Sequence, residues 1–324
     1  MGGSAMELNE ELLARMDYRM NQVRFFEEKI RELVADGALN GAVHLAIGQE
    51  ASDIGACLAL DAGDWVTMTH RCHGQAIASG MEVRRMMAEV LGKKSGLCGG
   101  KAGSLHLADA SVRNLGAADV PGQGFSVACG AALTQKLQKT GNAVLCFGGD
   151  GAADEGSFHE ALNLAAVWQL PVIFFIENNF YSGTTAIEDH MKGEHIADRA
   201  HAYGMPGITV DGNDVVAVFT AVDQARAHVK EGNGPALIEA QTYRLCGHDT
   251  ADLQLYRPKE EVEAWVENDP IVRFEEQLQS DFQMAPEVID QLKKNAKRSV
   301  EEAADFAINA DEPAMSEVIT GVFA

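Results

Sequence analysis

The sequence predicts an α/β protein built on one doubly wound, mostly parallel β-sheet, with helices on both faces and helical extensions at the N- and C-termini. Short strand-like runs recur at residues 143–147, 172–176, 207–211 and 235–240, and the first of them is apolar throughout and bounded by turn residues, as expected of a strand buried on both faces. Segments with helical spacing of apolar residues lie between these runs. Such repeated β–α alternation is typical of a doubly wound sheet.

Ahead of the first run, the sequence predicts a long helix, a short helix and a short strand. Asn9 can cap the long helix, whose apolar face would supply core packing or a subunit contact. A helix of small residues is expected over 51–60, and a strand over 63–69. The glycine-rich stretches 92–103 and 113–124 favour irregular loops that lie against a ligand.

Prolines help to place the remaining helices. Pro171 forces the turn that follows one helix, while Pro258, Pro270 and Pro286 mark helix starts in the charged C-terminal part. The helices expected between the apolar runs and beyond cover residues 126–138, 155–168 and 215–231 and several segments after residue 259.

Length and composition agree with one large domain. With 324 residues, of which 46% are hydrophobic, the chain can bury a large core; we assign residues 6–324 to a single domain and residues 1–5 to an expression scar or a disordered end. No apolar run reaches the roughly 20 residues that span a bilayer, and no signal or transit peptide is recognised, so a cytoplasmic location is expected. A net charge of −22 argues against nucleic acid and anionic membrane as partners. The six scattered cysteines indicate buried, reduced thiols.

One segment carries most of the functional information. The run 143–147 leads into a Gly-Asp-Gly triplet centred on Asp150, and the run 172–176 leads into an Asn pair that ends at Asn179. A strand–helix–strand unit returns parallel, so Asp150 and Asn179 should emerge at the same edge of the sheet, where ligands of open α/β sheets bind. Carboxylate and amide oxygens suit Mg²⁺, and N–H groups at a helix start suit phosphate. The pattern therefore predicts a magnesium–diphosphate site.

Further motifs, taken in order along the chain, resemble a known family. They are His44-Leu-x-Ile-Gly-Gln-Glu-Ala, Thr69-His-Arg-x-His-Gly74, Gly99-Gly-Lys-Ala-Gly-Ser-Leu-His106, Gly149-Asp-Gly with Asn178-Asn179, and Tyr243-Arg-x-x-Gly-His248. From about residue 8 to its end, the chain resembles the alpha subunit of the thiamine diphosphate-dependent decarboxylating component of 2-oxo acid dehydrogenase complexes. It looks most like the acetoin dehydrogenase branch, because pyruvate-type relatives more often have Tyr at the position of His70.

The resemblance implies thiamine diphosphate and Mg²⁺ as cofactors. Mg²⁺ would be held by Asp150, Asn179 and the carbonyl of Tyr181. Arg71 would form a bidentate fork on the diphosphate. The residues expected to contact the cofactor are His70, Arg71, Pro121, Gly149, Gly151, Ala152, Asn179, Ser182 and His248.

His73 and His248 are the candidate catalytic residues. A histidine can donate to a substrate carbonyl, and its switch between neutral and cationic forms near physiological pH suits proton transfer. A purely structural role is the alternative for each of them and for His106. For Arg71, the alternative is a surface ion pair. For Ser182, it is a hydroxyl group that only stabilises a turn.

The resemblance also implies that this chain holds half of an active site. In the superfamily, a glutamate that activates the aminopyrimidine ring comes from a second, pyrimidine-binding domain, and this chain has room for one domain. We therefore expect a beta subunit in an α₂β₂ heterotetramer, and no turnover by this chain alone. The acyl fragment of acetoin, pyruvate or another 2-oxo acid would pass to a lipoyl group on a dihydrolipoyl acyltransferase.

The segment 116–122 departs from the family pattern, most notably at Asp119 and Pro121. Relatives typically have Gly-Ala-Asn-Gly-Ile-Val-Gly where this chain has Gly116-Ala-Ala-Asp119-Val-Pro121-Gly122. Asp119 adds a negative charge near the expected diphosphate, and Pro121 removes an N–H group. Two alternatives follow: a thiamine diphosphate-dependent carboligase or lyase that delivers the fragment to an aldehyde, and a degenerate, non-catalytic partner subunit. A nicotinamide-dependent dehydrogenase is disfavoured, because no Gly-x-Gly-x-x-Gly opens a helix after a strand.

Overall fold

The computed structural model describes residues 8–317 and 319–320, and its centre is a six-stranded, all-parallel sheet in the order β2-β1-β3-β4-β8-β7. Its strands are β1 Trp65–Met68, β2 Asn114–Ala117, β3 Val144–Gly149, β4 Val172–Asn178, β7 Gly207–Asp211 and β8 Ala236–Gln241. A separate antiparallel hairpin joins β5 Tyr181–Ser182 to β6 Thr185–Ala186. The sheet grows outward in both directions from β1 and β3, which confirms the predicted doubly wound class. Residues 1–5, predicted as a scar or a disordered end, lie outside the described residues.

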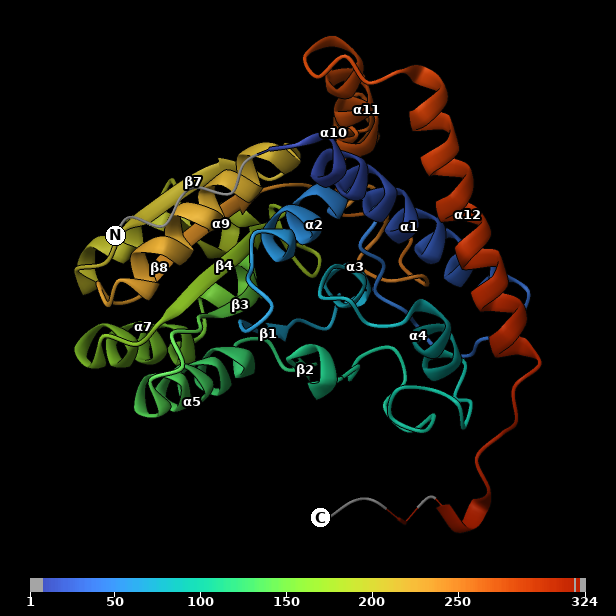
Figure 1. Ribbon diagram of the computed structural model, residues 1–324, viewed down its shortest axis with the longest axis horizontal. Coiled ribbons are helices and arrows are strands. Elements are labelled where there is room, and N and C mark those ends of the chain that lie inside the picture. Colours follow the sequence, from blue (N-terminus) through green and yellow to red (C-terminus); the bar gives the residue numbers. More distant parts are fainter. Residues whose placement is uncertain (1–7, 318, 321–324) are drawn as a thin grey trace.

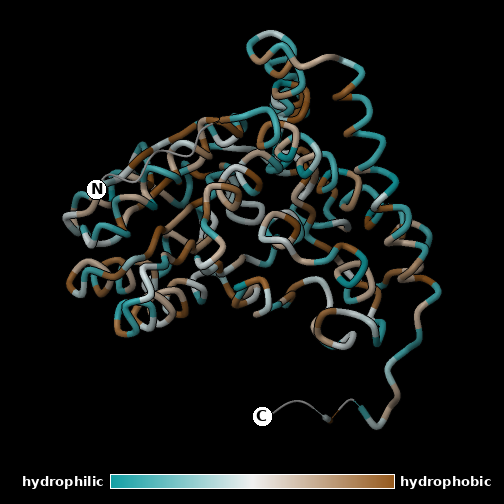
Figure 2. Tube along the Cα trace, viewed as in Figure 1, coloured by the Kyte–Doolittle hydropathy of each residue, from teal (hydrophilic) through white to brown (hydrophobic). Residues whose placement is uncertain are grey.

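Helices cover both faces of the sheet because the inner strands send apolar side chains alternately to each side (Figure 1). In β3, Val144 and Cys146 join the apolar cluster that includes α5 and α7, whereas Leu145 and Phe147 join the one that includes α2 and α9. Figure 2 shows hydrophobic residues gathered in these central strands. The covering helices are α2 Glu50–Leu58, α5 Gln123–Gln138, α7 Gly156–Trp168 and α9 Val215–Lys230.

The predicted helical extensions are present and pack side by side. In α1, Leu12 N donates to the Asn9 side chain over 2.9 Å, so the predicted cap is formed. Long helices of the two termini, α1 and α12, lie against each other (Figure 1). The extension helices are α1 Glu10–Ala35, α10 Lys259–Val266, α11 Pro270–Ser280 and α12 Pro286–Ile308, and two further helices, α3 His73–Ala78 and α4 Val83–Val90, connect them to the sheet.

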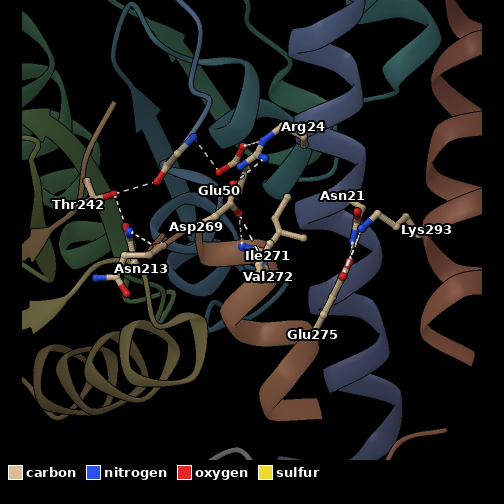
Figure 3. Close-up of polar contacts among 12 residues, drawn as sticks. Asn21, Arg24, Glu50, Asn213, Thr242, Asp269, Ile271, Val272, Glu275 and Lys293 are labelled. Atoms are coloured by element: carbon tan, nitrogen blue, oxygen red, sulfur yellow. Dashed lines mark hydrogen bonds and ion pairs between the residues drawn. The ribbon is translucent and has the colours of Figure 1, made fainter. Parts of the chain in front are cut away.

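One arginine links three of these elements (Figure 3). Arg24 of α1 lies 2.6 Å from Glu50 at the start of α2 and 2.9 Å from Asp269, which caps α11. The Glu50 side chain has no exposed surface, and its second oxygen accepts from Gly48 N at 2.9 Å. The pair therefore holds the turn that leads into α2.

The edge strand β2 differs from the prediction, because residues 113–124 were expected to be a loop. β2 has four residues, includes a glycine, and has β1 as its one neighbour in the sheet, with a register shift between Val66 and Met68. A strand of four residues is too short to show a recognisable alternation of apolar and polar residues. The remaining short helices are α6 Asp150–Ala153, α8 Ile187–His190, η1 Ala110–Val112, η2 Ile196–Tyr203 and η3 Met315–Glu317. In the described part of the chain, none of the helices is both long and apolar enough to cross a membrane.

Candidate active site

A cavity of about 390 Å³ lies at the carboxyl ends of the strands, where the turns after β1, β2, β3, β4 and β8 meet. This is the place where the sheet order reverses, which is the usual ligand site of a doubly wound sheet. Of the predicted site residues, its wall includes His70, Arg71, Pro121, Gly149, Asp150, Gly151, Ala152, Asn179, Tyr181, Ser182 and His248. His73 does not line the cavity.

Two glycines keep the floor of the cavity clear. A Cβ at Gly151 would lie 2.0 Å from Ser182 Oγ and 2.7 Å from Ser182 Cβ, so a larger residue fits only if Ser182 moves. At Gly149 a Cβ would meet no atom within 4 Å and would project into open space. At Gly151 the missing side chain thus lets Ser182 pack closely, while at Gly149 the space stays open.

Asp150 is the first residue of α6 and directly follows β3. Its side chain is 3% exposed, and its Oδ2 forms an ion pair of 3.4 Å with Nε2 of His190, whose pKa Asp150 and Asp154 raise to about 9. Asn179 follows the neighbouring strand β4, and its amide is oriented by Gln49 Oε1 and Tyr181 N, each at 3.3 Å. These hard oxygens suit a cation such as Mg²⁺.

The turn after β4 is held by the C-terminal extension. Phe180 has φ +66°, a left-handed conformation that is uncommon for a residue with a side chain. Its ring packs on Trp265 of α10, with centroids 5.8 Å apart, and Trp265 also stacks on Tyr243 at 5.0 Å. Glu261 of the same helix accepts from Tyr181 Oη at 3.0 Å and from Tyr243 Oη at 2.6 Å. One short helix thus holds both the turn after β4 and the segment after β8.

Two arginines supply positive charge to the cavity. Arg71 donates to the carbonyl oxygens of Leu45, at 2.6 Å, and His248, at 3.0 Å. Arg244 is only 1% exposed and donates to Gly183 O at 2.8 Å, but its Nε and Nη1 atoms are buried without a partner. Burial and the charge of Arg244 lower the pKa of Arg71 to about 10. The Arg71 guanidinium, which was predicted to bind the diphosphate, therefore already donates to two backbone carbonyls. Arg244, in contrast, has two donors without a partner.

Three histidines, His44, His70 and His248, form one part of the wall. The ring centroids of His44 and His70 are 4.7 Å apart, and those of His44 and His248 are 4.8 Å apart. Burial, and then the charge of Arg71, lower the pKa of His44 to about 4 and that of His70 to about 3, and both lower the pKa of His248. The neutral form of His248 is thus favoured near pH 7, contrary to the expected switch between charge states there.

His73 occupies a different place from the one expected for a catalytic residue. It is the first residue of α3, and its ring is 1% exposed and faces α1. Its Nδ1 lies 2.8 Å from Glu27 Oε2, and its Nε2 lies 2.9 Å from Ser104 Oγ. With both ring nitrogens engaged outside the cavity, contact with substrate is not supported. The structural alternative fits: His73 fixes Ser104, whose neighbour Leu105 lines the cavity.

Some wall residues were not singled out from the sequence, although their motifs were recognised. They are His44, Gln49, Glu177 and Arg244. Glu177 is buried and accepts from Ser52 Oγ and, at 2.8 Å, from Gln75 Nε2, and burial raises its pKa. Its position directly before the Asn pair was the available signal.

Asp119 and Pro121, which depart from the family pattern, lie at the mouth of the cavity. Asp119 follows the edge strand β2, two strands away from β3 in the sheet order, and its carboxylate lies 3.8 Å from His106 Nε2. Both side chains are about half exposed.

Comparison with known proteins identifies the family. Residues 18–316 match the family model described as the dehydrogenase E1 component. The chain belongs to the dehydrogenase E1 component family. This E1 component is 45% identical over 319 residues to the alpha subunit of acetoin:2,6-dichlorophenolindophenol oxidoreductase of Bacillus subtilis, a match that covers 98% of the chain and 95% of that relative.

Of two further relatives of this E1 component, one is again named as an acetoin oxidoreductase subunit and the other as a pyruvate dehydrogenase subunit. The alpha subunit of the same acetoin oxidoreductase from Cupriavidus necator is 38% identical over 321 residues, covering 99% of the chain and 96% of the relative. The pyruvate dehydrogenase E1 component subunit alpha of Rhizobium meliloti is 37% identical over 322 residues, covering 99% and 92%. The predicted family, an oxidoreductase and the alpha subunit of a thiamine diphosphate-dependent dehydrogenase, is confirmed. The name alpha subunit implies a beta subunit.

Proposed function

We propose that this chain is the alpha subunit of a thiamine diphosphate-dependent acetoin dehydrogenase, with a 2-oxo acid such as pyruvate as the alternative substrate. One observation carries the proposal: the cavity contains the buried carboxylate of Asp150, held only by a 3.4 Å ion pair with His190, and two buried donors of Arg244, Nε and Nη1, that have no partner. A metal-bound diphosphate would satisfy both at once. Acetoin is preferred because the relatives that are 45% and 38% identical are named for it.

The residues present fit such a cofactor. Asp150, the Asn179 amide oxygen and the Tyr181 carbonyl would hold Mg²⁺. Arg244, Arg71 and the backbone N–H groups at the start of α6 would face the phosphates. The remaining predicted contacts along the wall are His70, Pro121, Gly149, Gly151, Ala152, Ser182 and His248. When bound, thiamine diphosphate supplies the carbon nucleophile that attacks the substrate carbonyl and takes up the electrons of the broken C–C bond.

This chain supplies orientation and hydrogen bonds for that chemistry. His248, neutral near pH 7, can donate a hydrogen bond to the carbonyl oxygen of the substrate, where negative charge develops. Burial in the protein strengthens that interaction. The acyl fragment would then pass to the lipoyl domain of a dihydrolipoyl acyltransferase. That residues 6–324 form one domain, and that the protein is cytoplasmic, remain predictions.

An uncharged surface beside the cavity supports a beta subunit in an α₂β₂ heterotetramer. Helix α5 has Lys136 as its one charged residue, although the chain has a net charge of −22. Val127 and Leu137 of α5 and Val167 of α7 are 48%, 73% and 69% exposed. The surface continues into Val120, which lines the cavity and is 57% exposed. Depletion of charge in exposed apolar surface is typical of the core of an interface.

The function is tested by co-expressing the chain with its beta subunit and assaying acetoin-dependent and pyruvate-dependent reductive acylation of a lipoyl domain. We expect turnover with acetoin by the complex and none by either subunit alone. Reaction only with an aldehyde acceptor would favour a carboligase. Binding of the beta subunit without binding of thiamine diphosphate would indicate a degenerate partner subunit.

His248 should matter for turnover more than for folding. His248→Ala in the complex should lower kcat and kcat/KM together by roughly 10²-fold, because the lost hydrogen bond acts on charge that develops in the transition state. Steady-state kinetics, with cofactor titration and thermal melting as controls, measure this. A variant that keeps full kcat but melts several degrees lower would assign His248 a structural role.

A further inference from the structure

Three histidines from three separate segments converge in the cavity. His44 precedes α2, His70 follows β1 and His248 follows β8. Each offers one ring nitrogen, and these nitrogen atoms all lie within 4.8 Å of one another. Among residues 8–317 and 319–320, this is the one group of three or more His, Cys, Asp or Glu side chains with the spacing of a metal site.

The imidazoles have free lone pairs to offer. His44 Nδ1 is buried and has no hydrogen-bond partner. Burial and the charge of Arg71 lower the pKa of all three histidines, so the neutral form, which is the form that binds a metal, prevails at physiological pH. A carboxylate is absent from the group, which disfavours Mg²⁺ and Ca²⁺ and favours metals that prefer imidazole.

Geometry requires only a small movement. Zn–N bonds of about 2.0–2.1 Å in a tetrahedron place the nitrogen atoms about 3.3–3.4 Å apart. The largest separation of 4.8 Å must therefore shrink by about 1.5 Å, which rotation of the rings can supply. Since the three rings line the cavity, the fourth position of the metal would face open space and could take a water molecule.

Two nearby guanidinium groups limit the affinity. Arg71 and Arg244 are positive and close enough to disfavour a cation here, as they disfavour protonation of the rings. Both, however, donate to backbone carbonyls, of Leu45 and His248 in one case and of Gly183 in the other. We therefore expect a dissociation constant on the order of 1–10 μM, which is far weaker than that of a structural zinc site.

We propose that His44, His70 and His248 form a binding site for Zn²⁺, distinct from the Asp150 site. A metal held there would occupy cavity wall that cofactor and substrate need. Resting on the proposed function, we therefore expect reversible inhibition of the assembled enzyme by micromolar Zn²⁺ in the presence of excess Mg²⁺.

Binding is tested on the full chain without cofactor, using Zn²⁺ titration calorimetry and the absorption spectrum of Co²⁺ as a substitute. We expect one metal per chain, strong visible bands of a four- or five-coordinate ion, and no near-ultraviolet band from thiolate ligands. His70→Tyr and His44→Ala should each weaken Zn²⁺ binding at least tenfold. His201→Ala, which removes an exposed histidine of η2, is the matched control and should bind as the unmodified chain does.

A weak six-coordinate Co²⁺ spectrum, a thiolate band, or unmodified affinity in both cluster variants would overturn the proposal. If the variants fail to fold, X-ray absorption of the unmodified chain with Zn²⁺ decides, because fewer than three imidazole ligands would be incompatible with it. These measurements need neither beta subunit nor thiamine diphosphate. Their failure would leave the proposed function standing, and the failure of that function would leave them unaffected.

Discussion

Asp150→Ala should abolish the magnesium-dependent binding of thiamine diphosphate to the assembled enzyme. The carboxylate is the one anionic group among the three proposed metal ligands, and its side chain is only 3% exposed. Loss of a second-shell partner of a metal already weakens binding by about 10- to 100-fold, so loss of the charged ligand itself should exceed roughly 100-fold. Arg71 and Arg244 alone cannot neutralise two phosphates and replace the metal.

The measurement is a titration of thiamine diphosphate into the α–β complex, with Mg²⁺ and with EDTA. Asp189→Asn, at an exposed carboxylate on α8, is the control for a loss of one negative charge and should retain the affinity. Asp150→Ala also removes the ion pair with His190, so thermal melting of the variant, measured beside the titration, shows whether it is folded. Unchanged magnesium-dependent affinity in Asp150→Ala would refute the proposed metal site.

Arg24→Met should lower the free energy of unfolding by about 3–5 kcal/mol, because it leaves the buried carboxylate of Glu50 without its cation. The same change should disturb the turn at Gly48, through which Glu50 holds the chain beside Gln49 in the cavity wall. Urea denaturation, followed by circular dichroism, measures the effect.

A matched control is available on the surface. Arg84→Met breaks an ion pair with Glu302 in which both side chains are 52% exposed, and it should cost less than about 1 kcal/mol. The double variant Arg24→Met/Glu50→Gln should recover part of the loss, since it removes the uncompensated charge. Equal, small effects of Arg24→Met and Arg84→Met would show that the buried pair contributes nothing beyond a surface contact.

The sheet could be predicted because its signal is local. The runs 143–147 and 172–176, which make up most of β3 and β4, are apolar throughout. The existence and direction of these strands and the adjacency of Asp150 and Asn179 therefore follow from the chain itself. The edge strand β2 was missed because four residues with one neighbour need no apolar period.

Side-chain direction, by contrast, depends on distant partners. His73 turns toward Glu27 of α1, and Arg71 toward the carbonyls of Leu45 and His248, segments that no local pattern brings together. Arg244 was visible in its motif, but its free donors become apparent only when Gly183 and the cavity are both in place. The sequence therefore predicts which residues belong to the site better than it predicts what each side chain contacts there.

The contacts of α10 with the turn after β4 and the segment after β8 limit how far the chain can be shortened without losing the cofactor site. Glu261 and Trp265 lie beyond the last strand, yet they hold the turn that presents the Tyr181 carbonyl and the segment that presents Arg244. The six strands and their covering helices therefore do not make a portable cofactor domain. In any chimera that exchanges C-terminal segments between relatives, α10 has to travel with the sheet, and the junction belongs after Val266 rather than at the apparent end of the α/β unit.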